Sequence, residues 1–211
     1  MAENISVEKI KKALIKVADK LKEERRYFNK LDAPIGDSDH GDSVSKAFQK
    51  VKEIIVDSEA DIGKLLKDAG FSISSLGGGA MGPLYGTAFM EAGRAVSGKN
   101  SITYQELVDM WLNFAEGIQK RGEVKLGDKT MYDTIKPAVD ELEKAYKNEK
   151  NLEEAVKLTI EAAEKGMNST KDMLSKKGRS SRLGKRTKGH IDPGAASMYT
   201  IISTFFKEII N

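Results

Sequence analysis

Apolar residues recur along this chain at the three- and four-residue spacing of amphipathic helices, from Ile10 to Ile209. We find no convincing alternation of apolar and polar residues of the kind that marks a strand. The pattern predicts an all-α fold with about eight helices, forming a single domain over residues 1–211. The stripes are Ile10, Leu14, Val17 and Leu21; Val44, Phe48, Val51 and Ile55; Ile62, Leu65, Leu66, Ala69 and Ile73; Leu107, Met110, Trp111, Phe114 and Ile118; Met198, Ile202, Phe205 and Ile209; and segments 83–97, 131–146 and 152–174.

Several of these predicted helices begin at a capping signal. A short oxygen-bearing side chain before a helix accepts a hydrogen bond from a free N–H of the first turn, and proline suits the first helical position. Within 131–146, Pro137 predicts a kink or a late helix start. The starting signals are Ser6, Pro83, Thr103 with Glu106 as a capping box, and Asp192 followed by Pro193.

Four glycine-rich loops interrupt the helical pattern, at residues 32–43, 74–86, 120–131 and 176–194. In an up-and-down bundle, successive loops alternate between the two ends. Loops that gather at one end would form a site, whereas loops scattered over both ends would be connectors. The sequence leaves both alternatives open.

The composition is that of a soluble globular protein. Of its 211 residues, 39% are hydrophobic and 32% charged, the net charge is +3, and there is no cysteine. This near balance of charge does not point to nucleic acid, and no apolar run approaches the roughly 18 residues of a membrane span. The N-terminal segment also lacks the apolar stretch of a signal peptide. We therefore expect a cytoplasmic protein with neither a nucleic-acid nor a membrane partner.

The first glycine-rich loop concentrates negative charge in the stretch LDAPIGDSDHGDS. Asp32 is expected at the end of the first helix, with Asp37 and Asp39 close behind it. The side chains of Asp37 and Asp39 lean to opposite sides unless the loop curls. Gly36 and Gly41 permit that curl by admitting positive φ, and Asp32 could then enter the same space. The three carboxylates could then coordinate Mg²⁺, a hard ion that takes carboxylate oxygens. The alternative is an acidic turn whose only role is to cap a helix.

The other loops offer groups for anion binding. The glycine run before Pro83 could bring backbone N–H groups to a phosphate, or be only a tight turn. The segment from Lys171 to His190 carries eight Lys or Arg residues and one acid, and could be a solvated face or hold a polyanion. Because it lacks interleaved aromatic residues, nucleic acid is disfavoured. His190 is interpreted as a catalytic base or phosphoryl carrier, or as a polar residue that organises a helix start. Together the loops supply the parts that phosphoryl transfer needs.

Four motifs in register resemble the nucleotide-binding L subunit of dihydroxyacetone kinase. They are IGDSDHG, GGGAMGPLYGTAF, LGDKTMYDTIKPA and GHIDPGAAS, and the resemblance extends from about residue 7 to 209. It implies an eight-helix antiparallel barrel with an ADP or ATP site built from the loops at one end.

The resemblance also implies the roles of particular residues. Asp32, Asp37 and Asp39 match the family's ligands for two Mg²⁺ ions that bridge the nucleotide phosphates. It assigns no certain catalytic residue to this chain. The implied nucleotide-binding positions are His40, Gly41, Asp42, Ser43, Gly79, Ala80, Met81, Gly122, Met131, Arg179, Asp192, Pro193 and Gly194.

Three departures from the family pattern concern the same loops. Met81 replaces a serine in the glycine turn, which removes one hydroxyl group. Asp42 and Ser43 stand where the family often has an apolar residue and then asparagine or threonine. The segment that is expected to cover the site is more basic than usual, at Arg182, Lys185 and Lys188.

The resemblance implies a subunit that works with partners. A chain of 211 residues has no room for a substrate-binding K domain, which favours the stand-alone, phosphoenolpyruvate-dependent version. There, an M-type phosphocarrier phosphorylates bound ADP, and the resulting ATP phosphorylates dihydroxyacetone on the K subunit. The alternatives are a kinase domain for another acceptor, such as another small ketose or a fatty acid, and a non-enzymatic nucleotide-binding module that contacts a transcription regulator.

Overall fold

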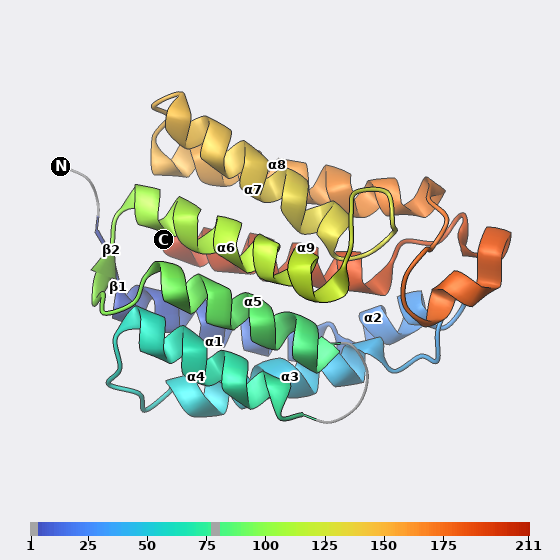
Figure 1. Cartoon of the computed structure of the whole chain (residues 1–211), viewed down its shortest axis with the longest axis horizontal. Helices are drawn as coiled ribbons and strands as arrows, with labels where there is room; N and C mark the ends of the chain where they lie inside the picture. The colour runs from blue at the N-terminus through green and yellow to red at the C-terminus, as the bar shows by residue number, and fades with distance from the viewer. Residues whose placement is uncertain (1–3, 77–80) are drawn as a thin grey trace.

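The computed structural model describes residues 4–76 and 81–211 of the chain (Figure 1). Its elements, in order, are β1 (Ile5–Ser6), α1 (Val7–Glu23), α2 (Arg25–Asp32), α3 (His40–Ile55), α4 (Ile62–Ser74), α5 (Met81–Ala95), β2 (Ser101–Ile102), α6 (Tyr104–Gly122), α7 (Tyr132–Lys147), α8 (Leu152–Ser169), the 3-10 helices η1 (Thr170–Asp172) and η2 (Arg179–Thr187), and α9 (Pro193–Ile210).

Within the described residues, eight α-helices form a closed ring. The order around the ring is α1, α3, α4, α5, α6, α7, α8 and α9, and α9 packs in turn against α1. Successive helices of the ring run in opposite directions (Figure 1). The expected all-α fold is thus confirmed, and the short helix α2 is an additional element that packs on α3 and α9.

The alternation of direction places the connections after α2, α4, α6 and α8 at the same end of the bundle (Figure 1). These connections contain the four glycine-rich loops, so the described parts of the loops gather at one end. For the same reason, α3, α5, α7 and α9 all begin at this end. The first turn of a helix has free N–H groups and a partial positive charge, so this end of the fold favours anions.

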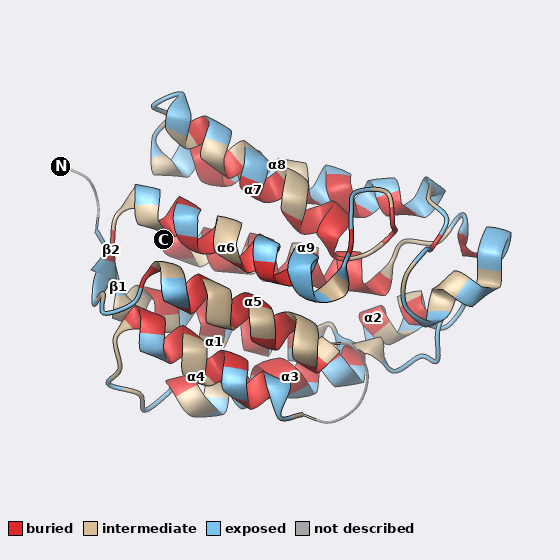
Figure 2. Ribbon diagram, viewed as in Figure 1, coloured by how far each residue is buried: buried red, intermediate tan, exposed pale blue. Residues whose placement is uncertain are grey.

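The interior of the ring is filled by aromatic and branched side chains, and the buried faces of the helices point inward (Figure 2). Trp111 lies 5.1 Å, between ring centroids, from both Phe205 and Phe206, and Phe48 packs edge-to-face on Tyr85 at 5.4 Å. Such tilted contacts suit the charge distribution of aromatic rings. Among the described residues, no helix has the length and apolar character required to cross a membrane.

Two short strands close the end opposite the glycine-rich loops. Ile5 pairs with Ile102 and Ser6 with Ser101 in an antiparallel arrangement, and Ile5 and Ile102 are both buried. The sequence did not predict these strands, because two residues are too few to produce an alternation of apolar and polar positions.

The capping signals at Ser6, Thr103 with Glu106, and Asp192 are confirmed as helix starts. The prediction that Asp32 ends the first helix is wrong: the chain turns at Glu24, so Asp32 ends the separate helix α2. Leu21 and Phe28 lie seven residues apart and are both buried, so the helical period continues across this break.

Three other predicted boundaries shift. Helix α5 begins at Met81 rather than Pro83. Pro137 lies inside α7 after a full turn of helix, so the late start is wrong. Helix α8 ends at Ser169 and passes into η1, short of the predicted end at residue 174.

Candidate functional site

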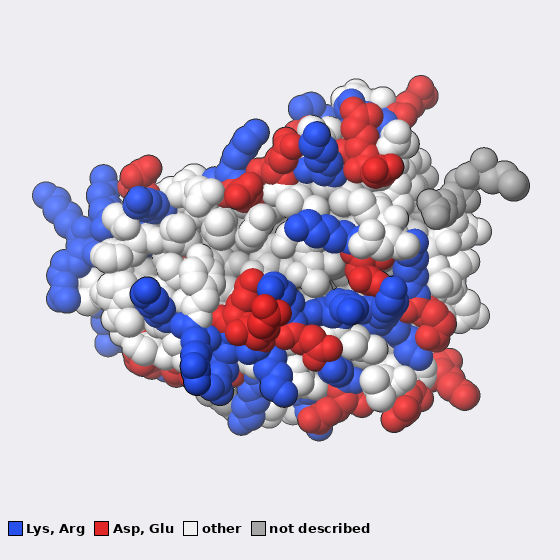
Figure 3. Space-filling model, turned by 180° about the vertical axis from the view of Figure 1, so that it is seen from behind, with Lys and Arg blue, Asp and Glu red and all other residues white. Residues whose placement is uncertain are grey.

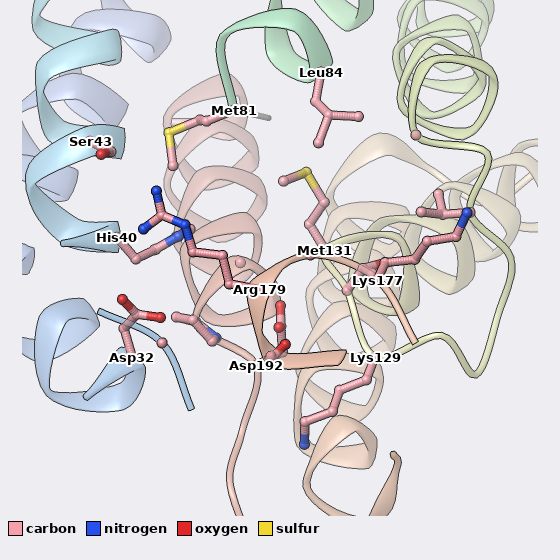
Figure 4. Close-up of a pocket in the computed structure, with 18 of the residues that line it drawn as sticks. Asp32, His40, Ser43, Met81, Leu84, Lys129, Met131, Lys177, Arg179 and Asp192 are labelled. Carbon is pink, nitrogen blue, oxygen red and sulfur yellow. The ribbon is translucent and has the colours of Figure 1, made fainter. Parts of the chain in front are cut away.

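A cavity of about 840 Å³ lies at the loop end and is lined by residues from all four glycine-rich loops (Figure 4). One part of its lining is charged and another is apolar. The charged residues are Asp32, Asp37, Asp39, Arg121, Lys129, Lys177, Arg179 and Asp192. The apolar residues include Met81, Leu84, Ile118, Val124 and Met131. This division suits a ligand with an apolar ring at one end and charged groups at the other.

The three aspartates of the first loop meet at the cavity, as the metal-binding alternative requires. One carboxylate oxygen from each of Asp32, Asp37 and Asp39 lies within 4.8 Å of the other two. Asp32 is only 8% exposed, and its Oδ2 accepts a hydrogen bond from the Asp39 N–H at 3.1 Å. Three carboxylates this close repel one another unless a cation lies among them, and their oxygens suit Mg²⁺.

The curl of this loop has a different origin from the predicted one. The positive φ belongs to Ser38, at 66°, and not to Gly36 or Gly41. The two glycines are required instead by close approach: a Cβ on Gly36 would lie 2.0 Å from Asp32 Oδ1, and a Cβ on Gly41 would lie 2.0 Å from the Arg25 carbonyl oxygen. Glycine therefore allows the loop to fold directly onto α2.

Arg179, at the start of η2, brings a positive charge to the aspartates. Its guanidinium group pairs with Asp37, and its Nη1 lies 3.8 Å from Asp39 Oδ2. Figure 4 shows its side chain reaching from the covering segment toward His40. An arginine in this position can bind an oxyanion held next to the aspartates.

Two of the expected nucleotide-binding positions do not line the cavity. Asp42 points toward α2, where its carboxylate accepts from Asn29 Nδ2 at 2.6 Å and pairs with Arg25 Nη1 at 3.1 Å. Gly41 is buried against Arg25, and its N–H donates to Asn29 Oδ1 at 2.7 Å. Asp42 therefore adds no negative charge to the lining, whereas Ser43 in the next position does line the cavity.

His40 lies at the cavity wall and is held from behind by α9. Its Nε2 lies 2.9 Å from Ser197 Oγ, and that hydroxyl donates to the Gly194 carbonyl at 3.1 Å. The hydroxyl therefore accepts from the Nε2–H, which leaves Nδ1 as the acceptor. Burial lowers the pKa of His40 to about 4, although the Asp32 charge opposes this. The imidazole is consequently neutral near pH 7.

The apolar side of the cavity is formed where α5, α6 and α7 meet. Met131 precedes α7, and its side chain points toward Leu84 and Met81 (Figure 4). Gly122 ends α6, and a Cβ there would lie 3.0 Å from Leu84 Cδ2. These positions form a slot in which a flat ring can lie against aliphatic and thioether groups.

Asp192, Pro193 and Gly194 form the start of α9 and also line the cavity. Asp192 Oδ2 accepts from the Ala195 N–H at 2.8 Å, so its carboxylate is the N-cap of the helix. Burial raises the pKa of Asp192 to about 7, although this hydrogen bond and Lys129 oppose the shift.

The raised pKa of Asp192 predicts a specific pH dependence of stability in the ligand-free protein. In the unfolded chain this carboxyl titrates near pH 4, so between about pH 4 and pH 7 the native state holds a proton that the unfolded state has lost. Stability should therefore fall with rising pH in this range, by up to about 1.4 kcal/mol per pH unit. Asp192→Asn, which still caps α9, should remove this fall in urea unfolding curves.

Asp61, the N-cap of α4, gives a contrasting control. The Lys64 N–H lowers the pKa of Asp61, so its contribution to stability is present above pH 4 and lost in acid. Asp61→Asn should therefore reduce stability at neutral pH and leave the Asp192-dependent fall unchanged. Equal pH profiles for Asp192→Asn and the parent chain would contradict the raised pKa.

Some residues of the cavity were not expected from the sequence. Lys129, Thr130, Lys177 and Ser180 all line it. A lysine in a polar loop normally lies in solvent, so no local pattern indicates that Lys129 is buried, yet it is only 1% exposed. Gly79 and Ala80 lie outside the described residues. His190 is not part of the lining, so its position supports neither a base nor a phosphoryl carrier.

The extra cations of the covering segment are exposed. Arg182, Lys185 and Lys188 lie in or next to η2 and form no ion pair with any described residue. Lys and Arg side chains gather at this end of the molecule when it is viewed from behind (Figure 3). They do not line the cavity, so they strengthen the positive field around its mouth rather than contact its interior.

The closed ring of helices and the charged cavity built from its end loops define a helical-barrel domain with a site at one end. The sequence model of the DAK2 domain family matches residues 34–207, and the chain therefore belongs to the DAK2 domain family.

Named relatives match most of the chain. It is 39% identical over 186 residues to the "PEP-dependent dihydroxyacetone kinase, ADP-binding subunit DhaL" of Escherichia coli, covering 88% of this chain and 89% of that protein. It is 38% identical over 192 residues to the "PEP-dependent dihydroxyacetone kinase 2, ADP-binding subunit DhaL" of Listeria innocua, and this match covers 90% of this chain and 88% of that protein.

The fold also matches a solved structure. The dihydroxyacetone kinase from C. freundii in complex with AMP-PNP and Mg²⁺ superposes with a TM-score of 0.70 at 20% identity. The match covers 98% of this chain and 35% of that one, so the chain spans about a third of the larger kinase. At this identity the likeness concerns the fold alone.

Proposed function

We propose that this chain is the ADP-binding subunit of a phosphoenolpyruvate-dependent dihydroxyacetone kinase. The observation that carries the proposal is the meeting of Asp32, Asp37 and Asp39 at one side of a cavity whose other side is apolar. The relatives named as ADP-binding subunits, which match nearly their whole length, support the same function.

In this proposal, the charged side of the cavity holds the phosphates and the apolar side holds the adenine. Asp32, Asp37 and Asp39 would hold the Mg²⁺ ions, of which we propose two. When bound, Mg²⁺ neutralises phosphate charge and polarises the phosphoryl group that is transferred. The partial positive charges of the helix N-termini add to this field.

The chain's own residues would position the nucleotide rather than exchange protons with it. Arg179 pairs with phosphate oxygens, the Ser43 hydroxyl donates to them, and neutral His40 presents Nδ1 toward the cavity. Met81 offers no hydroxyl, so its side chain would contribute no hydrogen bond to a phosphate. We assign no catalytic base to this chain, because the acceptor hydroxyl is activated where the acceptor is bound.

The proposal includes two partner proteins. An M-type phosphocarrier would phosphorylate bound ADP, and a K subunit would present dihydroxyacetone to the resulting ATP. Because phosphoenolpyruvate is a metabolite of the cell interior, we place the reaction in the cytoplasm. The acceptor is bound by the partner, so another small ketose would require no change in this chain. A contact with a transcription regulator has no support in the names of the relatives.

A reconstitution tests this function. Native mass spectrometry of the purified chain, dialysed against Mg²⁺, should show a mass increase equal to ADP and Mg²⁺. Adding the K and M partners with phosphoenolpyruvate should produce dihydroxyacetone phosphate without added free ATP. A protein without retained nucleotide that turns over only with excess ATP would contradict the cofactor role, and bound nucleotide without any product would favour a non-enzymatic module.

The orientation of the nucleotide can be tested at Met131. Met131→Ala removes apolar surface from the proposed adenine slot and should weaken ADP binding about tenfold, or about 1.4 kcal/mol. Pyrophosphate has no ring, so its Mg²⁺-dependent binding should be unchanged in the same variant. Isothermal titration with both ligands measures this. If the affinities for ADP and for pyrophosphate fall equally, the adenine does not lie against Met131.

A further inference from the structure

The segment that covers the cavity, residues 171–191, begins within η1 and ends shortly before α9, and its two ends meet. We call it the cap. At its base, the Gly189 N–H donates to the Lys171 carbonyl at 2.8 Å. Just outside it, the Asp192 N–H donates to Thr170 Oγ1 at 3.0 Å. These bonds form a narrow neck, so the position of the whole cap depends on whether the neck stays closed.

Lys129 reaches the neck from a different part of the fold, the loop between α6 and α7. Its Nζ donates to the Thr170 carbonyl at 2.6 Å and to the His190 carbonyl at 2.5 Å, one on each side of the neck. In Figure 4 its side chain points away from Met131 and Arg179. One ammonium group thus connects the two backbone segments of the neck to each other and to the third glycine-rich loop.

Burying this ammonium group is costly unless its donors are satisfied. Lys129 is 1% exposed, and burial lowers its pKa, while the charges of Asp192, Asp172 and Asp133 oppose this. It forms no direct ion pair with a described acid, so the two carbonyl oxygens are its hydrogen-bonded partners. Hydrogen bonds from a charged donor are stronger than neutral ones, particularly when water is excluded.

The other charged side chains that attach the cap are exposed to solvent, and one backbone hydrogen bond, from the Lys176 N–H to the Asp128 carbonyl at 3.1 Å, also holds it. Lys176 donates to the Gly127 carbonyl at 2.8 Å, but its side chain is 54% exposed. Arg179 pairs with Asp37, and its side chain is 65% exposed. Exposed polar contacts exchange readily with water and contribute little. Of these three charged donors, Lys129 is the one that is protected from competition by solvent.

We propose that Lys129 is the positioning residue of the cap: it closes the neck and thereby sets how slowly a ligand leaves the cavity. The effect on the neck stands on the contacts of Lys129 alone. The effect on ligand release rests on the proposed function, with ADP and Mg²⁺ as the ligand.

Limited trypsin digestion tests the neck without any ligand. The cap contains its own cleavage sites, at Arg182, Lys185 and Arg186. Lys129→Met should be cleaved within the cap at least about tenfold faster than the parent chain, while its far-UV circular dichroism is unchanged. Lys136→Met is the matched control, because it removes a partly exposed lysine that pairs with Asp140 on α7. If Lys129→Met is folded and trypsin cleaves its cap at the same rate as in the parent chain, the proposal is wrong.

A chemical rescue separates the ammonium group from general packing. The chain has no cysteine, so Lys129→Cys introduces a single thiol that bromoethylamine alkylates selectively in the unfolded chain. After refolding, the aminoethyl side chain restores an ammonium group at nearly the same reach. Slow cleavage of the cap should return. Failure of a refolded, alkylated chain to regain protection would assign the effect to the loss of packing and overturn the role of the charge.

A second experiment measures the rate at which the chain releases ADP in the presence of Mg²⁺, by displacement of a fluorescent analogue. Release from Lys129→Met should be about tenfold faster than release from the parent chain. If the parent chain binds ADP and both release it equally fast, the proposed control of release is wrong. If the parent chain binds no nucleotide while the trypsin result holds, the proposed function fails and the role of Lys129 at the neck stands.

Discussion

Replacing Asp39 by asparagine is expected to abolish magnesium-dependent nucleotide binding and to leave the helix content intact. The Asp39 carboxylate shares a 4.8 Å cluster with Asp32 and Asp37, but it belongs to the loop before α3 and is exposed. Asparagine keeps the size of the side chain and removes one negative charge from the cation site. The affinity for ADP with Mg²⁺ should fall at least about 100-fold, or about 2.7 kcal/mol, in isothermal titration.

Asp42 provides a matched control, because it lies three residues later and is also exposed. Its carboxylate contacts Arg25 and Asn29 and does not line the cavity. Asp42→Asn should therefore change nucleotide affinity less than threefold, while Asp37→Asn should behave like Asp39→Asn. If Asp39→Asn unfolds both with and without ligand, the aspartates have a structural role. Retained affinity in a folded Asp39→Asn chain would remove them from the site.

The sequence predicted the helices well because most of the information is local. Ser6, Thr103 and Asp192 cap the helices that follow them, and each cap is a contact with a residue three positions later. The apolar stripes likewise depend only on the period of the helix. The convergence of the loops could not be read in the same way, because it depends on the closure of the ring from α1 to α9.

The parts of the site that the sequence failed to predict depend on contacts between distant segments. Lys129 is a loop lysine in sequence, and only the neck formed by Thr170 and His190 makes it buried. The break at Glu24 is hidden because Leu21 and Phe28 keep the helical spacing. The predicted role of Gly36 and Gly41 is also wrong, because local propensity favours turn geometry over close approach as the reason for a loop glycine.

The loop of aspartates is held in place by the contact between the first turn of α3 and helix α2. Asp39, the N-cap residue of α3, forms no capping hydrogen bond with its own side chain. Asn29 of α2 takes that role: its Oδ1 accepts from the N–H groups of Gly41 at 2.7 Å and Asp42 at 3.3 Å. This contact is possible only because Gly41 lies directly against the α2 backbone at Arg25.

Gly41→Ala is therefore expected to disturb both the fold and the site. The added Cβ would lie 2.0 Å from the carbonyl oxygen of Arg25, and a backbone atom cannot move aside as the end of a side chain can. The start of α3 must shift, which lengthens the hydrogen bonds to Asn29. Overpacking together with a lost cap should lower the free energy of unfolding by about 3 kcal/mol in urea.

The consequence for the site separates this effect from simple loss of stability. Asp39 and His40 immediately precede Gly41, so a shifted α3 moves a carboxylate out of the cluster and weakens Mg²⁺-dependent ADP binding even under conditions where the chain is fully folded. Asn29→Ala, which removes the cap without a clash, should cost about 1 kcal/mol. Gly122→Ala is the stability control, since its Cβ would meet only side-chain atoms of Leu84 and Val124, at 3.0 and 3.2 Å. If Gly41→Ala proves as stable as Gly122→Ala, α2 can move to accommodate the added Cβ without a measurable cost. The contact between α2 and α3 would then not be what positions the aspartate loop.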